Sequence, residues 1–396
     1  MLIPVVILTA LSAAACLVWM SRHLRIWREQ RDGFLLTGEY GGPPSGAPSL
    51  SVVIAAKDEA ECIESCVRTM LQQDYPDFEV LVCNDRSQDQ TPAILERLAG
   101  QDGRLRVFHI DHLPDGWKGK NNAMQIGIAA ARGEWICMVD ADCRQLSHRT
   151  LSAAMQYAFD TRSDFLSVLP QHEMVGFWEN VAQPVGTGVM MIWFDPQRVN
   201  DPRKPHAYAN GAFMLMTRSA YQTIGTHEAF KECLNEDMHM AARAKGAGLR
   251  LRVVRSRGLE VLRMYTSPQQ MLRGWSRIFL GTFGTLKRLT ASLGLLVVMG
   301  LLPYAAAALG FALAARGTAP NAWWWACGVA GAAGAAMQVS VIYRFYKLIG
   351  ARKELAWSYP LGCAFMVVCL ILSLAKCRKG ARITWRDTSY SSTAGS

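Results

Sequence analysis

Between residues 50 and 140, short apolar runs alternate with amphipathic segments along this chain of 396 residues. Four of the apolar runs have the length and composition of buried strands, at residues 51–56, 78–83, 105–110 and 135–139. Segments 59–72 and 121–131, which lie between these runs, are predicted helices. Strands that alternate with helices predict a doubly wound, mostly parallel sheet, so we expect an α/β domain here.

A second pattern, of long apolar stretches, predicts membrane helices near both ends of the chain. Residues 2–20 are uncharged and long enough to span hydrocarbon, and no basic segment precedes them. We therefore interpret residues 1–21 as an uncleaved signal anchor rather than a cleaved signal peptide. Arg22, Arg25, Arg28 and Arg31 follow, which predicts a cytoplasmic location for the next domain. Further candidate spans lie at 293–315, 323–342 and 359–375.

The basic tail conflicts with this simple topology. Three crossings after a cytoplasmic domain would put the C-terminus outside. The tail nevertheless carries Lys376, Arg378, Lys379, Arg382 and Arg386, which the positive-inside rule keeps in the cytoplasm. Either one candidate span does not cross or the rule fails here, and the sequence leaves both readings open.

Residues 172–200 interrupt the α/β pattern. The segment is apolar and aromatic, but Pro184, Gly186 and Gly188 break it. We expect an interfacial segment that lies along the membrane, and the alternative reading is a buried core helix. The expected organisation is a signal anchor at 1–21, a basic segment and flexible linker at 22–49, a cytoplasmic domain with interfacial segments at 50–290, transmembrane helices at 291–376 and a basic tail at 377–396.

Composition supports an enzyme domain joined to membrane spans. Hydrophobic residues make up 51% of the chain and charged residues 19%, with a net charge of +10. The basic residues gather beside apolar segments, which favours a membrane surface over nucleic acid as their partner. The 11 cysteines are scattered without a CxxC pair, which is typical of core thiols in a reducing compartment. No GxGxxG follows the first strand, so a dinucleotide site is not expected.

Three acidic stations follow the predicted strands or begin a helix: Asp85, the pair Asp140 and Asp142, and the pair Glu236 and Asp237. Ligands of open α/β sheets bind at the carboxyl ends of the strands. Two carboxylates two residues apart can share Mg²⁺ or Mn²⁺ with diphosphate oxygens, so Asp140 and Asp142 form a candidate metal site. Asp85 is a candidate ligand of a base or ribose, although Asn-Asp also favours a turn.

The third station has two readings. Asp237 can act as a general base toward an acceptor hydroxyl, with Glu236 as the alternative base. The other reading is that both acids simply pair with a helix N-terminus. Lys118 and Lys120 precede a predicted helix whose N-terminus suits phosphate, or they belong to a solvated basic loop. Gln270, Arg273 and Trp275 lie in an amphipathic stretch before the spans, where they can contact diphosphate and acceptor or sit at the membrane interface.

Taken together, these motifs resemble the family 2 glycosyltransferases, whose pattern is D, DxD, ED and (Q/R)xxRW in that order. The resemblance covers residues 50–280 through "SVVIAAKDEAE", "NDRSQDQT", "VDADC", "NED" and "QMLRGW". It implies a glycosyltransferase A-type fold and transfer with inversion. Two departures are visible, because Asp58 stands where Asn is usual and Gly274 separates Arg273 from Trp275.

The resemblance also implies a role for each station. Asp237 would be the base, Asp140 and Asp142 would hold the metal, and a further set would contact the acceptor or diphosphate: Gln270, Arg273 and Trp275. The nucleotide sugar would be bound by Ala55, Lys57, Glu59, Asp85, Lys118, Lys120 and Asp140.

Further motifs resemble membrane enzymes that glycosylate lipids, such as carotenoid-acid, hopanoid-associated and ceramide glycosyltransferases. They are "NGAFMLMTRSAY", "VLRMY" before "GWSRIF", and "ITWRDTSY". The resemblance predicts a hexosyltransferase on the cytoplasmic face of the cell (inner) membrane that moves a sugar from a nucleotide donor, UDP-linked, to a lipid. Two alternatives are a processive polysaccharide synthase and an inactive membrane scaffold that binds a nucleotide sugar.

Overall fold

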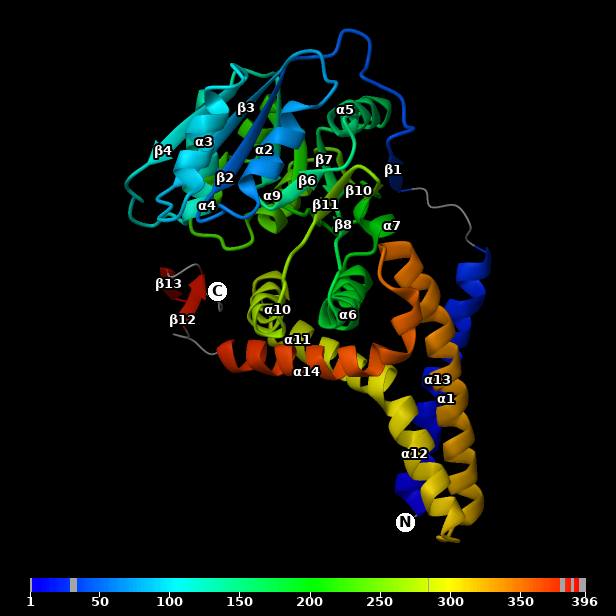
Figure 1. The fold of residues 1–396 in the computed structure, drawn as a ribbon. Helices are drawn as coiled ribbons and strands as arrows, with labels where there is room; N and C mark the ends of the chain where they lie inside the picture. The colour runs from blue at the N-terminus through cyan, green and yellow to red at the C-terminus, as the bar shows by residue number, and fades with distance from the viewer. Residues whose placement is uncertain (1, 29–33, 284, 378–381, 386–387, 392–396) are drawn as a thin grey trace. The chain divides into compact units, whose positions relative to one another are not determined.

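The computed structural model describes residues 2–28, 34–283, 285–377, 382–385 and 388–391 (Figure 1). The chain divides into two compact units. The first, here called the sheet unit, consists of Gly33–Glu173 and Met191–Met264. The second, the helical unit, consists of Met1–Asp32, Met174–Met190 and Tyr265–Ser396. Segments 174–190 and 265–290, which we expected within the domain at 50–290, thus belong to the helical unit.

An eight-stranded, mostly parallel sheet forms the centre of the sheet unit, as the apolar pattern predicted. Its order is β1 (Leu35–Thr37), β10 (Leu251–Arg257), β7 (Phe165–Leu169), β9 (Phe213–Thr217), β5 (Trp135–Asp140), β2 (Leu50–Ala56), β3 (Phe78–Asp85) and β4 (Leu105–Ile110). Only β9 pairs antiparallel with its neighbours in this sheet. A small second sheet contains β6 (Cys143–Gln145), β11 (Glu260–Leu262) and β8 (Gln171–His172).

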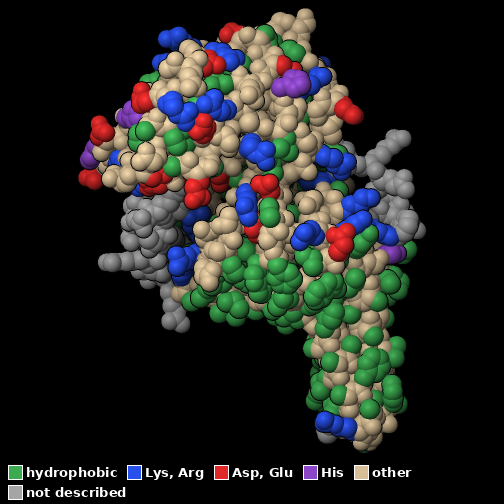
Figure 2. Space-filling view, viewed as in Figure 1, with side chains coloured by type: hydrophobic (Ala, Val, Ile, Leu, Met, Phe, Trp, Pro, Cys, Tyr) green, Lys and Arg blue, Asp and Glu red, His purple; other side chains and the backbone are tan. Residues whose placement is uncertain are grey.

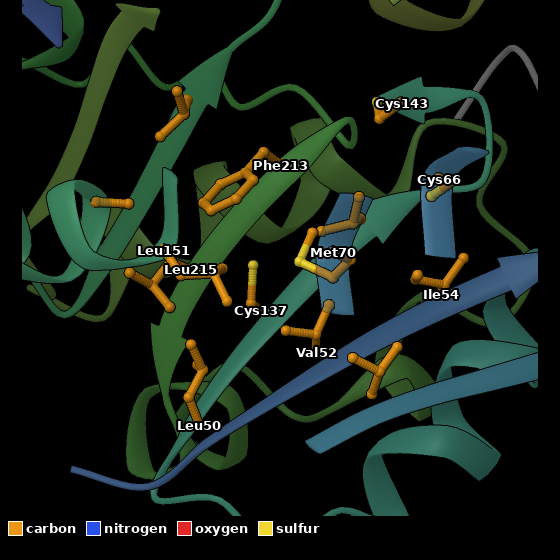
Figure 3. Packing of buried hydrophobic residues seen from close by; sticks show 14 of the residues in the cluster. Leu50, Val52, Ile54, Cys66, Met70, Cys137, Cys143, Leu151, Phe213 and Leu215 are labelled. Atoms are coloured by element: carbon orange, nitrogen blue, oxygen red, sulfur yellow. The ribbon is translucent and has the colours of Figure 1, made fainter. Parts of the chain in front are cut away.

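Helices cover both faces of the large sheet, because successive side chains of a strand point to opposite faces. Val52 and Ile54 of β2 pack with α2 (Ile63–Leu71), α3 (Thr91–Ala99) and α5 (Thr150–Asp160) in one core cluster, part of which Figure 3 shows. Val53 belongs to a second cluster with α4 (Gly119–Ala130), α8 (Arg218–Thr223) and α9 (Glu236–Gly246). The short helices α7 (Pro196–Val199) and η1 (His227–Phe230) complete this unit.

The first helix begins later than the sequence suggested. We expected a helix at 59–72, whereas α2 starts at Ile63. The preceding backbone is bound to a neighbouring loop instead, since Glu59 N–H donates to Thr91 Oγ1 at 2.9 Å and Ala60 N–H donates to Asp89 Oδ2 at 3.0 Å. Asp58 has φ +53°, a left-handed conformation that Asn and Asp adopt more readily than most residues. The Asp at a position where Asn is usual therefore has a conformational explanation.

Among the described residues, four helices are long and apolar enough to cross a membrane, and all belong to the helical unit: Leu2–Leu24, Leu286–Ala315, Asn321–Ile349 and Lys353–Lys376. Its elements are α1 (Leu2–Arg28), α6 (Phe177–Trp193, whose last residues join the sheet unit), α10 (Pro268–Phe283), α11 (Leu286–Leu295), η2 (Leu296–Leu301), α12 (Leu302–Ala315), α13 (Asn321–Ile349), η3 (Lys353–Ser358), α14 (Tyr359–Lys376) and the paired strands β12 (Arg382–Trp385) and β13 (Thr388–Ser391). Within the interrupted segment at 172–200, α6 is a continuous helix that accommodates Pro184, and the short α7 follows it.

One candidate span is not a uniform helix. Residues 286–315 change from α11 to the π-helical turn η2 and then to α12, which begins just before Pro303. A proline removes a backbone donor and crowds the preceding turn, so irregular helix is expected on its N-terminal side. Figure 1 shows that α11 and α12 run in different directions on either side of this turn.

Candidate active site

Three parallel strands bring their carboxyl ends to one edge of the sheet. Ala55 is paired in register with Asp140 of β5, and Ala56 with Asn84 of β3. This register places the chain after each strand at the same edge. The residues expected to bind nucleotide and metal thus start from neighbouring strand ends, where α/β sheets bind ligands.

Asp85 is buried at the end of β3 and is held by its neighbour. The Arg86 side chain donates from Nε to Asp85 Oδ1 at 2.8 Å and from Nη2 to Oδ2 at 3.0 Å. Gly119, at the start of α4, lies so close that a Cβ there would overlap Asp85 Oδ2. A bidentate pair fixes the plane of the carboxylate. The orientation of Asp85 is therefore set by Arg86 and by the absence of a side chain at Gly119.

The metal station concentrates negative charge. Burial, followed by the charges of Asp140 and Glu59, raises the pKa of Asp142 to about 7. Carboxylates that share a site repel one another and favour protonation unless a cation is present. Among the residues that the structure describes, no group of three or more His, Cys, Asp or Glu side chains is arranged to hold a metal ion. A metal on Asp140 and Asp142 would therefore draw on further ligands, such as diphosphate oxygens.

Lys120 connects the second and third acidic stations. Its Nζ lies 2.7 Å from Asp140 Oδ1 and 2.8 Å from Glu236 Oε1. Burial alone would lower the pKa of Lys120, but the charges of Asp140 and Glu236 raise it well above its ordinary value. The lysine is thus a fixed cation between the two carboxylates. It also neutralises Glu236, which is buried at the start of α9.

Asp237 is oriented by backbone donors instead of a lysine. Its Oδ2 accepts from Gly211 N–H at 3.0 Å, and its Oδ1 accepts from Met238 N–H at 2.7 Å. Burial and, to a smaller extent, the charge of Glu236 raise the pKa of Asp237 to about 7, against the opposite effect of Lys120 and the two N–H groups. A carboxylate whose pKa is near 7 suits a general base at neutral pH.

Gly211 lies where these groups meet. A Cβ on Gly211 would be 3.0 Å from Lys120 Nζ and 3.7 Å from both Asp140 Oδ2 and Asp237 Oδ2. The structure therefore brings Lys120, Asp140, Glu236 and Asp237 together, although they are separated by up to about a hundred residues in sequence. Gly211 was not among the site residues expected from the sequence. Its position within the motif "NGAFMLM" was the only sequence signal that could have drawn attention to it.

Two more residues that shape the site were not expected from the sequence. Asn121 is buried, and its Nδ2 donates to the carbonyls of Phe230 (2.6 Å), Lys231 (3.3 Å) and Cys233 (2.9 Å). This holds the segment before Glu236 against α4. Lys118 N–H also donates to Lys231 O, at 2.7 Å. Arg86, the partner of Asp85, is the second. Hydrogen bonds between distant segments leave no periodic signal in the sequence. The one available signal for Asn121 was a polar Asn inside the predicted helix, in "KNNA".

The remaining predicted residues lie in the helical unit, on α10. Arg273 and Gln270 are exposed, and Gln270 Oε1 accepts from Thr266 N–H at 3.0 Å. Trp275 is 3% exposed and packs on Gly186 of α6, where a Cβ would lie 2.6 Å from its ring. Gly274 faces the Tyr265 ring, which a Cβ would overlap, so the glycine between Arg273 and Trp275 has a packing reason. Contact of these residues with an acceptor stays a prediction.

Comparison with known proteins identifies the class. Residues 51–225 match the family model "Glycosyl transferase family 2", so this part of the chain is a domain of that family. The match covers two of the three acidic stations, at Asp85 and at Asp140 and Asp142, together with the Gly211 segment, and it ends before Glu236 and Asp237. It confirms that the protein is a glycosyltransferase with a glycosyltransferase A-type fold. The four apolar helices fit a membrane-associated member.

Individual relatives agree with this assignment. The 4,4'-diaponeurosporenoate glycosyltransferase of Staphylococcus aureus (strain MRSA252) is 27% identical over 277 residues, which cover 68% of this chain and 70% of the relative. The protein of the same name from strain USA300 has the same identity and coverage. Mannosyltransferase PcManGT from Pyrobaculum calidifontis, solved in complex with GDP-Man and Mn²⁺, aligns with a TM-score of 0.52 and 19% identity over 83% of this chain and 98% of that one. At this identity, the structural likeness concerns the fold.

Proposed function

We propose that this glycosyltransferase moves one sugar from a nucleotide donor, UDP-linked, to a membrane lipid, with inversion at the anomeric carbon. One observation carries the proposal: a paired-carboxylate station and a second carboxylate with a pKa near 7 meet at Lys120 and Gly211. A membrane acceptor is supported by the four apolar helices and by the relative named for a carotenoid acid.

The donor is proposed to bind along the strand ends. Asp85, with its plane fixed by Arg86, would accept hydrogen bonds from the nucleoside, and Ala55, Lys57 and Glu59 lie on the adjacent strand end. Lys118 and the N-terminus of α4 supply positive potential for phosphate.

Asp140 and Asp142 would hold Mg²⁺ or Mn²⁺ beside the diphosphate. Both are oxygen ligands of the kind these ions prefer. The mutual repulsion of Asp140, Asp142 and Glu59, which raises the pKa of Asp142, is what a divalent cation would relieve. When bound, the metal supplies neutralisation of the charge that develops on the departing nucleoside diphosphate.

Asp237 is proposed to take the proton from the acceptor oxygen. Single displacement requires one base on the side of the sugar opposite the leaving group. Glu236 is a weaker candidate, because it is buried and already forms an ion pair with Lys120. The Asp237 carboxylate accepts hydrogen bonds from two backbone N–H groups, and no salt bridge to it is found among the described residues. These bonds orient the carboxylate without neutralising it.

To test this proposal, membranes that contain the full chain are incubated with a panel of labelled nucleotide sugars. The label that is transferred to extracted lipid is then measured by mass spectrometry. Transfer of a single sugar to lipid, lost in Asp237→Asn, is the expected result. Label in an aqueous polymer would instead favour a processive synthase. Donor binding without any transfer would favour an inactive scaffold. A stereochemical analysis of the product reports inversion directly.

A further inference from the structure

Helix α14 is apolar enough to cross a membrane, yet its packing differs from that of the other candidate spans. Helices α1, α12 and α13 pack along one another, with Gly310 against the backbone of Gly328 and Gly331 against Ala307. Figure 1 shows these three helices side by side and α14 lying across their direction, next to α10 and α11. The fourth candidate therefore does not belong to the three-helix bundle.

The contacts of α14 are with helices that carry polar groups. Ser373 Oγ donates to Ser276 O of α10 at 2.8 Å, and Gly362 lies so close to α6 that a Cβ would overlap Val181 O. Cys363 faces Gly300 of η2, where a Cβ would be 2.6 Å from its Sγ. These contacts occur near both ends of α14. The helix therefore packs against α6, η2 and α10.

The two helices that flank α14 are poor candidates for crossing. The α6 helix contains Glu179, Asn180 and Gln183, and α10 contains Arg273 and Arg277 within sixteen residues. Neither is among the helices with the length and hydropathy of a span. Helix α14 packs along α10 and contacts α6 near its own N-terminal end, at Gly362, so it shares the depth of these partners. A crossing by α14 would draw these polar residues into hydrocarbon, which is costly.

The face of α14 that points away from these partners is also apolar. Leu361, Val368, Ile371 and Leu372 are exposed, Ile371 by 51% and Val368 by 47%. Figure 2 shows hydrophobic side chains gathered over the region where Figure 1 places α14. An apolar patch of this kind marks a surface that water does not cover. The basic residues around this face indicate a membrane surface, since Lys376 ends α14 and Arg378, Lys379 and Arg382 come next in sequence.

We propose that α14 lies in the plane of the membrane, with its exposed face in the boundary between headgroups and acyl chains, and that only α1, α12 and α13 cross. Three crossings then put the basic tail on the same side as the sheet unit. The arginines at the C-terminal end of α1 (Arg22, Arg25 and Arg28), Lys287 and Arg288 before α12, and Lys347 at the end of α13 all fall on that side too. With only two crossings after the sheet unit, the basic tail lies on the side that the positive-inside rule requires. The proposal does not depend on the nature of the donor or acceptor.

Protease-site insertion in the full chain tests this topology. One site is placed after Gly46, an exposed turn of the sheet unit, a second after Gly317 between α12 and α13, and a third on a short Gly/Ser extension after Ser396. Sealed membrane vesicles of both orientations are treated with protease. We expect the Gly46 and Ser396 sites to be cut from one side and the Gly317 site from the other. Cleavage of the Ser396 site together with the Gly317 site would overturn the proposal, as would cleavage of all three from one side.

A pair of lysine substitutions provides an independent test. Val368→Lys lies on the exposed face near the middle of α14, whereas Met366→Lys lies on the buried face. For a helix in the plane of the membrane, the lysine at 368 reaches the headgroups, so the amount of protein in the membrane should stay within about two-fold and the cleavage pattern should not change. Met366→Lys should reduce the amount strongly. An equal loss in both variants, or a moved tail in Val368→Lys, would show that residue 368 lies in hydrocarbon and that α14 crosses.

Discussion

The assignment of different roles to two adjacent acids is the most informative point to test. Asp237→Asn and Glu236→Gln each remove one negative charge with little change of shape. The structure gives the two acids different partners, with Lys120 on Glu236 and backbone N–H groups on Asp237. If Asp237 is the base, Asp237→Asn should reduce kcat by about 10²-fold or more with a hydroxyl-bearing lipid, in line with general-base contributions. Donor affinity should change little.

Glu236→Gln should act on the pH profile instead of abolishing turnover. A base works only when ionised, so activity should rise with pH through the pKa of Asp237, about 7 in the folded protein. Two pH units below that pKa, about 1% of Asp237 is ionised, which predicts a roughly 100-fold fall in kcat. Glu236 raises this pKa, and its charge is lost in Glu236→Gln, so the acid limb should move to lower pH by on the order of one unit. Asp237 stays buried in this variant, so most of the increase in its pKa should remain.

The assay is kcat as a function of pH at saturating donor, with lipid product measured by mass spectrometry. The other charged and titratable groups that act on Asp237 are Lys120 and Tyr208, and neither is changed in these variants. Near-normal turnover of Asp237→Asn with a hydroxyl acceptor, together with loss of turnover in Glu236→Gln, would reverse the two roles. Normal transfer by Asp237→Asn to a carboxylate lipid alone would identify the acceptor class, because a carboxylate arrives already ionised.

Further predictions concern the metal, the lysine and the nucleotide site. EDTA should abolish turnover and Mn²⁺ or Mg²⁺ should restore it, while Asp142→Ala should fold by circular dichroism yet remain inactive; full activity in EDTA would contradict the metal assignment. Lys120→Met should move the acid limb of kcat to higher pH, opposite to Glu236→Gln, because Lys120 lowers the pKa of Asp237. Gly119→Ala should weaken nucleotide binding, measured by calorimetry, by about tenfold because its Cβ overlaps Asp85, whereas Gly103→Ala, which meets nothing within 4 Å, should not.

Much of the sheet unit could be predicted from local pattern. The four expected strands all form, because buried parallel strands are continuous apolar runs that are bounded by turns. The start of α2 at Ile63 was missed, since the side chains that bind the backbone at Glu59 and Ala60 come from a loop about thirty residues away. The antiparallel direction of β9 was not predicted either, because direction within a sheet depends on the path of the connections.

The acidic stations were visible in sequence because they directly follow strands or begin a helix. The sequence placed Asp140 and Glu236 on separate elements, and only the fold joins them through Lys120. The roles of Asn121 and Gly211 likewise depend on contacts with segments that are far away along the chain. An ion pair or a shared hydrogen bond between distant segments has no period, so no local pattern reports it.

For the helical unit, the sequence by itself determined which stretches are apolar, how long they are and where the basic residues stand. It also revealed that these facts conflict at the tail. The tertiary structure decided which helices pack together, with α1, α12 and α13 in one bundle and α14 on α6, η2 and α10. Hydropathy measures the free energy of moving a segment out of water and is nearly the same for a crossing helix and for one that lies between protein and lipid. Only the identity of the neighbouring side chains distinguishes the two.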